Sequence, residues 1–350
     1  MPPTNPHPQL QPAPLVSVLL PIRDAEDTLE AALNSVRASS LENLELVCVD
    51  DGSSDATPDI LARAAGDDGR VRVLRQPPLG LVPALNHGLE HCRCEFVARM
   101  DADDEMDPKR LELQLGALRE DPQLALVGCQ VESFREGGLL GGYEIYSEWV
   151  NQLLSHEAMR RECFVECPVP HPTWMFRGDR VRALGGYRDV DWPEDLDLLY
   201  RLLDAGERLG KVSLPLHRWR DHDTRLSRTD PRYSREAFAR AKAHYVGRLF
   251  PLRAAVIWGA GRTGKRFSRL LAAEGIRTHA FIDIRPDRQG NAWHQIPILG
   301  PDAAPEKLSG WLAAEMRILA AVSSRGARDE IRRALTAWEL REGEAFLMVA

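Results

Sequence analysis

Short apolar runs alternate with amphipathic stretches along the first hundred residues of the chain. Four of these runs are typical of strands buried on both faces: residues 16–22, 44–49, 71–74 and 96–100. Between the first two runs, Leu29, Leu33 and Val36 recur at the spacing of one helical face. Repeated strand–helix units predict an α/β fold with a mostly parallel sheet and helices on its faces.

Beyond residue 100 the pattern is less regular but still predicts individual elements. Glycines gather where an exposed loop or hairpin is expected, at Gly137, Gly138, Gly141 and Gly142. Helices are expected at 149–161, from about residue 193, and at 235–249, with a short strand at 174–176.

After residue 251 the chain repeats a strand, a glycine-rich turn, a helix and a strand, as in a dinucleotide-binding unit. The candidate ligand residues are Gly259, Gly261 and Gly264 in the turn and Asp283 at the end of the second strand. Glycines here would let a phosphate approach the helix N-terminus. Tight packing of strand against helix would need the same glycines, so both interpretations stay open.

The 350 residues are more than one small core holds, and we predict two domains after a leader. The proline-rich leader, 1–14, should be flexible. A larger α/β domain is expected at 15–250 and a smaller Rossmann-like domain at 252–350. The oligomeric state is left open, with a homo-oligomer as one option.

Composition narrows the partners and the compartment. A net charge of −7 argues against nucleic acid, because no overall positive field would hold a polyanion. We find neither a signal peptide nor an apolar run long enough to span a bilayer, and therefore expect a cytoplasmic protein. The basic stretch at 218–240 keeps a peripheral membrane contact open. Six cysteines without a paired framework indicate reduced, mostly buried thiols.

Carboxylates follow the predicted strands at the edge where ligands bind in such sheets. Asp50 and Asp51 end the second strand, and Asp101, Asp103 and Asp104 directly follow the strand at 96–100. Carboxylates this close repel one another unless protons or a cation neutralise them, and a hard divalent ion such as Mn²⁺ or Mg²⁺ would do so. The alternative is an acidic start to the helix expected near Pro108.

Five motifs in a fixed order carry a family resemblance. They are SVLLPI at 17–22, VDDGSSD at 49–55, ALNHGL at 84–89, ARMDADD at 98–104, and GGY at 185–187 with EDLDLLYRL at 194–202. In this order they resemble the family 2 glycosyltransferases, which have the GT-A fold. The resemblance covers the first 230 residues.

The resemblance implies a role for each matching residue. A nucleotide-sugar donor would lie against Pro21, Arg23, Asp50, Asp51, Asn86, Arg99 and Asp101. The metal ligands would be Asp103, Asp101 and His222, with a surface histidine as the alternative for His222. Asp195 would be the general base, with Glu194 orienting it or binding acceptor hydroxyls. We place His171, Trp174 and Trp192 on the acceptor side, with packing as the alternative for each.

The resemblance implies an inverting, metal-assisted transfer of a sugar from a nucleotide-diphosphate sugar. The nucleotide would be UDP, as is usual in the family. The acceptor would be a glycan, a lipid-linked glycan or another hydroxyl compound. One alternative keeps the fold but makes the protein a nucleotidyltransferase that builds an activated sugar. Another is a non-catalytic scaffold that binds sugar nucleotides. The sequence does not show which sugar, which acceptor or which linkage is used.

Overall fold

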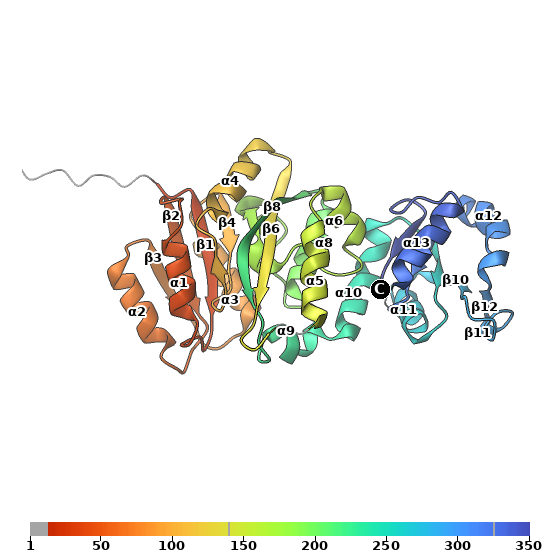
Figure 1. Cartoon of the computed structure of the whole chain (residues 1–350), viewed down its shortest axis with the longest axis horizontal. Coiled ribbons are helices and arrows are strands. Elements are labelled where there is room, and N and C mark those ends of the chain that lie inside the picture. Colours follow the sequence, from red (N-terminus) through yellow and green to blue (C-terminus); the bar gives the residue numbers. More distant parts are fainter. Residues whose placement is uncertain (1–12, 139–140, 325) are drawn as a thin grey trace, which may run out of the picture. The chain divides into compact units, whose positions relative to one another are not determined.

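The computed structural model describes residues 13–138, 141–324 and 326–350 (Figure 1). The predicted leader lies outside the described residues up to position 12. The chain forms two compact units, each of which has its own sheet. The first unit comprises the described residues up to Ser147 together with His171–Gly186 and Lys211–Arg220. The second unit comprises Glu148–Pro170, Tyr187–Gly210 and the described residues from Asp221 onward.

The sheet of the first unit confirms the predicted α/β fold. Its eight strands follow the order β3-β2-β1-β4-β7-β6-β8-β5. Their bounds are β1 Val16–Ile22, β2 Leu44–Asp50, β3 Val71–Arg75, β4 Phe96–Arg99, β5 Glu105–Met106, β6 Leu124–Phe134, β7 Met175–Arg177 and β8 Arg208–Arg220. The first four strands in that order are parallel, and β7 is antiparallel to both β4 and β6.

Helices cover both faces of this sheet (Figure 1). The helices here are α1 (Leu29–Arg37), α2 (Thr57–Asp67), α3 (Leu81–His91) and α4 (Arg110–Glu120). Leu33 of α1, Leu61 of α2 and Leu115 of α4 belong to one buried core with the side chains of alternate β1 residues. On α3, a Cβ at Gly88 would stand 2.1 Å from Cδ1 of Leu19. The glycine therefore lets α3 lie directly on the opposite face of β1.

Pro21 sits inside a central strand, where proline is normally excluded because it has no N–H for the ladder. The backbone carbonyl of Leu19 points toward β4, since it accepts the Met100 N–H at 3.1 Å. The backbone nitrogen of Pro21, two residues further along, points toward β4 as well. Pairing of β1 with β4 ends at Leu19 and Arg99, so the missing N–H leaves no ladder bond unmade. The chain can thus keep a rigid proline just where β1 reaches the edge that carries the polar residues.

The second unit contains a six-stranded sheet in the order β11-β12-β10-β9-β13-β14, parallel except for β11. The strands are β9 Ala254–Trp258, β10 Arg277–Ile282, β11 Ala292–Trp293, β12 Ile296–Leu299, β13 Met316–Ala320 and β14 Phe346–Met348. Its helices include α6 His156–Glu162, α8 Glu194–Asp204, α9 Leu226–Thr229, α10 Arg235–Leu249, α11 Arg262–Ala273, α12 Leu308–Ala313 and α13 Ala327–Ala337.

Buried charges tie this second sheet to the helices that precede it. Lys242 on α10 is buried, and its ammonium donates to the carbonyls of Val165 and Val349 at 2.8 and 3.4 Å. Arg332 on α13 donates to Glu162 at 2.5 Å and to Glu342 at 2.9 Å. Helices α6, α8 and α10 therefore belong to one unit with the C-terminal sheet. The predicted boundary at 250–252 falls between α10 and β9 and stays a prediction.

Two local predictions differ from the structure. The single helix expected at 149–161 is two helices, α5 (Gly141–Gln152) and α6. The second helix has its own N-cap, Ser155, whose hydroxyl accepts the Ala158 N–H at 3.1 Å. Gly141 and Gly142 begin α5 instead of lying in a loop. Within residues 13–138, 141–324 and 326–350, no helix is both long and apolar enough to cross a bilayer. All six cysteines are free and buried, as predicted.

The glycine-rich turn before α11 makes a matched pair of predictions. A Cβ on Gly264 would stand 1.8 Å from the carbonyl oxygen of Gly259, whereas a Cβ on Gly261 would meet its nearest neighbour, Arg288, at 3.5 Å. We expect Gly264→Ala to lower the free energy of unfolding by about 2–3 kcal/mol or more through overpacking against backbone. Gly261→Ala should change it by less than about 1 kcal/mol, because φ is −81° there. Urea unfolding of both variants measures the difference, and equal losses would contradict it.

Candidate active site

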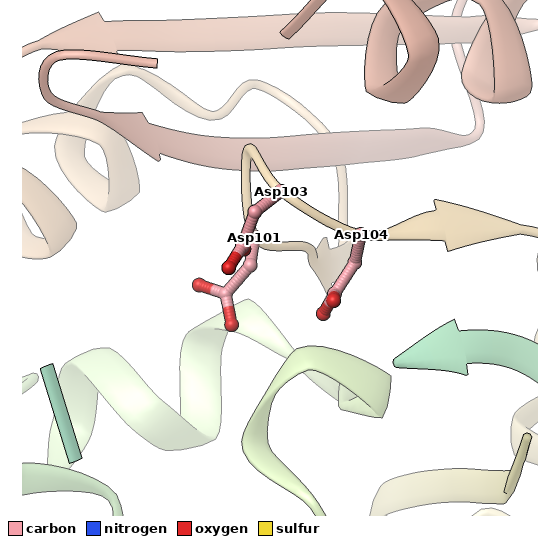
Figure 2. Close-up of side chains that lie close together, drawn as sticks. All are labelled: Asp101, Asp103 and Asp104. Atoms are coloured by element: carbon pink, nitrogen blue, oxygen red, sulfur yellow. The ribbon is translucent and has the colours of Figure 1, made fainter. Parts of the chain in front are cut away.

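Three carboxylates follow β4 on one tight turn, and Figure 2 shows them on the same side of the ribbon. One oxygen each of Asp101, Asp103 and Asp104 lies within 4.8 Å of the others. Opposite oxygen ligands of one Mg²⁺ stand about 4.2 Å apart, so small side-chain rotations of Asp101 and Asp103 would let these two share an ion beside Asp104. The oxygen-only chemistry also suits Mn²⁺ or Mg²⁺. The residues present therefore fit a hard divalent cation.

Two arginines, of which only Arg99 is buried, offset part of this negative charge. Arg99, at the end of β4, is buried, and its Nη2 lies 2.6 Å from Oδ1 of Asp101. Arg220 on β8 donates from Nε to the carbonyl of Asp103 at 2.8 Å. Asp101 and Asp103 are half-buried, while Asp104 is only 1% exposed. Two of the three carboxylates on the turn are therefore partly exposed to solvent, and the third is buried.

Asp104 is held by β8, a strand more than one hundred residues further along the chain. Its Oδ2 receives a hydrogen bond from Nε2 of His217 at 2.8 Å, and its Oδ1 accepts the Arg220 backbone N–H at 2.8 Å. The other ring nitrogen of His217 lies 3.1 Å from Nη1 of Arg110. Neither His217 nor Arg110 was predicted from the sequence, because no motif marks them and both are wholly buried.

Asp50 and Asp51, at the end of β2, shape two neighbouring turns. Oδ1 of Asp50 accepts the Ser53 N–H at 2.9 Å and so closes a local turn, an arrangement typical of aspartate side chains in loops. Asp51 accepts Nε2 of Gln76 and the backbone N–H groups of Leu79 and Gly80, at 2.7, 2.9 and 2.8 Å. Its carboxylate thereby fixes the loop that leads into α3.

Arg23 and Asn86 lie on the same unit as these carboxylates. Arg23 is half exposed, with Nη1 3.7 Å from Oδ2 of Asp51. Asn86 on α3 lies against the Gly185-Gly186 turn, where a Cβ on Gly186 would stand 2.6 Å from its Oδ1. Gly186 has a φ of +66°, so both conformation and space require glycine. Close packing therefore joins two of the motifs noted in the sequence.

His171 and Trp174 occupy a short segment before β7. Both are buried, and their rings meet edge to face with centroids 4.8 Å apart. Burial, with a smaller effect of Arg99, holds the pKa of His171 well below its usual range, which favours the neutral ring. Trp174 is 0% exposed and packs in the core in this structure. An acceptor-side role for either residue stays a prediction.

Glu194 and Asp195 begin α8, as predicted, in the second unit. Pro193 is the residue directly before the first helical turn. Glu194 is buried, and the Tyr233 hydroxyl lies 2.7 Å from its Oε2 and 3.0 Å from its Oε1. Asp195 is half-buried and accepts the Leu196 N–H at 2.7 Å. Tyr233 is a further residue that the sequence did not reveal.

A buried carboxylate further along α8 holds the surrounding aromatic residues. Asp197 accepts Nε1 of Trp192 at 3.1 Å and the Tyr245 hydroxyl at 2.8 Å, and pairs with Arg201 at 2.7 Å. Burial first, and then the hydrogen bond to Asp197 and the charge of that carboxylate, raise the pKa of Tyr245. Trp192 also lies beside His244 of α10, with ring centroids 5.3 Å apart. Its ring is thus fixed in place on the second unit.

One arginine, Arg228, holds the loop that contains His222. Arg228 contacts Asp221 at 2.6 Å and Asp223 at 3.1 Å, and closes the segment around the histidine. Nδ1 of His222 lies 2.8 Å from the Thr224 hydroxyl. The second unit therefore carries His222, Glu194, Asp195 and Trp192, while the first carries the donor-side residues and the acidic turn.

Asp283 accepts hydrogen bonds from the glycine-rich turn after β9 and from the loop that follows β10. Oδ2 of Asp283 accepts the Ala260 N–H at 2.7 Å and Nη1 of Arg288 at 2.8 Å, and its Oδ1 accepts the Arg285 N–H at 3.0 Å. Asp283, one of the candidate ligand residues, thus holds the turn in this structure. Gly259 has a φ of +112°, which only glycine adopts readily.

Removal of the Tyr233 hydroxyl should lower the free energy of unfolding, because the buried Glu194 carboxylate loses a hydrogen-bond donor. Tyr233→Phe leaves a buried carboxylate without its phenol donor, and we expect a loss of about 1–3 kcal/mol in the free energy of unfolding. The loss should be smaller when Glu194→Gln is already present, because the charged acceptor is then gone. Denaturant unfolding of both single variants and the double variant gives the coupling. A coupling of zero would mean that the contact contributes nothing.

Comparisons with known proteins agree with this geometry. The model of glycosyl transferase family 2 matches residues 17–183. The chain is 33% identical over 202 residues to the amylovoran biosynthesis glycosyltransferase AmsE of Erwinia amylovora, over 57% of this chain and 73% of AmsE. It is 30% identical over 226 residues to EpsE of Bacillus subtilis (strain 168), over 63% of this chain and 78% of EpsE.

A solved structure shares the fold. The crystal structure of TarS 1-349 of S. aureus in complex with UDP-GlcNAc aligns with a TM-score of 0.55 and 16% identity, over 74% of this chain and 71% of that one. The sheet and its acidic turn, with this likeness, define a glycosyltransferase of the GT-A fold. The chain belongs to glycosyltransferase family 2, and it is an enzyme of sugar transfer.

Proposed function

We propose that the protein is an inverting, metal-assisted glycosyltransferase that uses a nucleotide-diphosphate sugar, with UDP as the nucleotide. The observation that carries this proposal is the acidic turn after β4, where three carboxylates lie within 4.8 Å of one another. The donor would lie against Pro21, Arg23, Asp50, Asp51, Asn86, Arg99 and Asp101. TarS, which shares the fold, was crystallised with UDP-GlcNAc, and this supports a nucleotide sugar as the donor class.

Asp103 and Asp101 would hold Mn²⁺ or Mg²⁺, with His222 as a further ligand. The ion supplies charge neutralisation for the diphosphate leaving group. Arg99 holds Asp101 in place at 2.6 Å. The inward-facing Asp104 fixes the turn on β8 through its contacts with His217 and Arg220.

Asp195 is the proposed general base. It would take the proton of the acceptor hydroxyl as that oxygen forms a bond to the anomeric carbon, while the bond from this carbon to the diphosphate oxygen breaks on the opposite face. Its carboxylate is half-buried at the start of a rigid helix. Glu194 would bind acceptor hydroxyls or orient Asp195, and Tyr233 keeps it in place. His171, Trp174 and Trp192 complete the proposed acceptor side.

The acceptor is proposed to be a glycan or a lipid-linked glycan, in line with the polysaccharide pathway in the name of AmsE. A cytoplasmic location, with a peripheral contact at the membrane through the basic segment 218–240, belongs to the same proposal.

A panel of nucleotide sugars tests the donor proposal. With Mn²⁺ present, one UDP-sugar should raise the melting temperature and be hydrolysed slowly without acceptor. EDTA should abolish both effects. Stabilisation by a GDP-sugar alone would refute the choice of UDP, and full activity in EDTA would refute metal assistance.

For the C-terminal domain we propose a ligand site at Gly259, Gly261, Gly264 and Asp283. The approach of a phosphate needs the open backbone at Gly261, where the nearest group to a Cβ would be the Arg288 guanidinium at 3.5 Å. The full-length protein and its Gly261→Ala variant should be titrated with NAD and nucleotide sugars. Binding that the alanine weakens supports the site, whereas identical titrations of the two proteins would leave close packing as the role of the glycines.

A further inference from the structure

We propose that His217 is a positioning residue, locked by Arg110 in one tautomer so that it holds Asp104 and thereby shapes the acidic turn for a divalent cation. The inference rests on the proposed metal role of that turn. It begins with a buried chain of side chains in the first unit: Gln114, Arg110, His217 and Asp104. All four are between 0 and 1% exposed.

The direction of each hydrogen bond follows from chemistry. A guanidinium has only donors, so Nδ1 of His217 must accept from Arg110 at 3.1 Å. The proton of the neutral ring is then on Nε2, which donates to Oδ2 of Asp104 at 2.8 Å. A second positive charge on the ring would face the guanidinium directly. The structure therefore allows one state of the ring at this position.

Arg110 is itself fixed on its other sides. Its Nε donates to Gln114 at 3.1 Å and its Nη2 to the carbonyl of Arg99 at 2.7 Å. Gln114 in turn donates to the carbonyls of Val127 and Thr173 at 2.8 and 2.7 Å. The guanidinium is thus anchored to β4, β6 and the segment before β7, and cannot turn away from the histidine.

Asp104 must accept on both of its oxygens. Oδ1 faces the Arg220 N–H and Oδ2 faces the His217 N–H. An asparagine would place an NH₂ group against one of these donors, whichever way its amide turned. This position therefore requires a side chain with two acceptor oxygens, and the contacts of Asp104 with β8 set the path of the turn that carries Asp101 and Asp103.

Partners that orient metal-binding groups typically change metal affinity by about 10–100-fold when removed. We expect His217→Leu to weaken Mn²⁺ binding by this factor in the absence of any substrate, as measured by the EPR signal of free Mn²⁺. His217→Gln should restore most of the affinity, because its amide can both donate to Asp104 and accept from Arg110. Asp104→Asn should weaken binding as His217→Leu does.

His156→Leu is the matched control, since His156 accepts the Leu209 N–H at 3.1 Å near the start of β8 and has no hydrogen bond to Asp104. It should lower the melting temperature and leave Mn²⁺ affinity unchanged. A His217→Leu protein that is folded and binds Mn²⁺ within twofold of the parent would overturn the positioning role.

A second readout separates this inference from the proposed function. The ¹⁵N spectrum of histidine-labelled parent protein should contain a ring with the proton on Nε2 that is missing from His217→Leu. The opposite tautomer would overturn the locked chain, whatever the protein binds. The expected tautomer in a parent that binds no Mn²⁺ would instead refute the metal role and leave the hydrogen-bond chain intact.

Discussion

Asp103→Asn is expected to abolish metal-dependent binding of the donor, with a loss of about 100-fold or more in Mn²⁺ affinity. The substitution keeps the shape of the side chain but removes one of three negative charges that lie within 4.8 Å of one another. A hard cation prefers carboxylate oxygen, and the neutral amide is a far weaker ligand. Without metal, the variant should be as stable as the parent or more so, because like-charge repulsion is relieved.

Calorimetric titration with Mn²⁺, followed by the nucleotide sugar, measures both steps. Asp107→Asn is the matched control, because Asp107 is an exposed residue on the same segment that caps the Lys109 N–H at 2.8 Å, and an asparagine oxygen can keep that bond. The control should bind like the parent. If Asp103→Asn binds Mn²⁺ and donor with parent affinity, the acidic turn is not the metal site.

Asp195→Asn should bind the donor normally and lose turnover. The loss of a general base costs about 10²–10⁴-fold in rate, so kcat with acceptor should fall by that factor. The fold should be unaffected, since an asparagine oxygen can accept the Leu196 N–H that Asp195 accepts at 2.7 Å. The donor-induced rise in melting temperature should match that of the parent.

Steady-state rates with a fixed donor and varied acceptor test this assignment. Asp204→Asn, at the exposed C-terminal end of the same helix, removes one charge without touching the start of α8 and should keep full turnover. Parent-like turnover of Asp195→Asn would show that another group removes the proton. Glu194→Gln would then be the next variant to measure.

The elements with a strong period were predictable from the sequence. The apolar run at Val16–Ile22, the helix Arg235–Leu249 and the strand Ala254–Trp258 have the bounds that their patterns indicate. Strands with mixed polarity were not predictable. β8 is half exposed along its middle, and β6 loses its apolar character toward its end, so neither shows a clean period of two.

The acidic turn was visible in the sequence because its residues are adjacent, whereas its supports were not. His217 meets Asp104 from 113 positions away, and Tyr233 meets Glu194 from 39 positions away. Local pattern carries no information on such contacts, since they depend on which strands and helices become neighbours. A buried histidine or arginine in a sequence of ordinary composition looks like any surface residue.

The Lys242 ammonium in the second unit has a consequence for shortened forms of the protein. Burial lowers the pKa of Lys242. One of the two carbonyls that accept a hydrogen bond from its ammonium is that of Val349, directly after β14. Helix α10 also lies so close to the loop after α11 that a Cβ at Gly247 would stand 2.8 Å from Ile276. Cutting the chain at residue 250 would expose this apolar side and strip a buried amine of an acceptor. We therefore expect a chain that ends at residue 250 to be less stable than the full chain, and helix α8, which packs against α10, to lose stability with it.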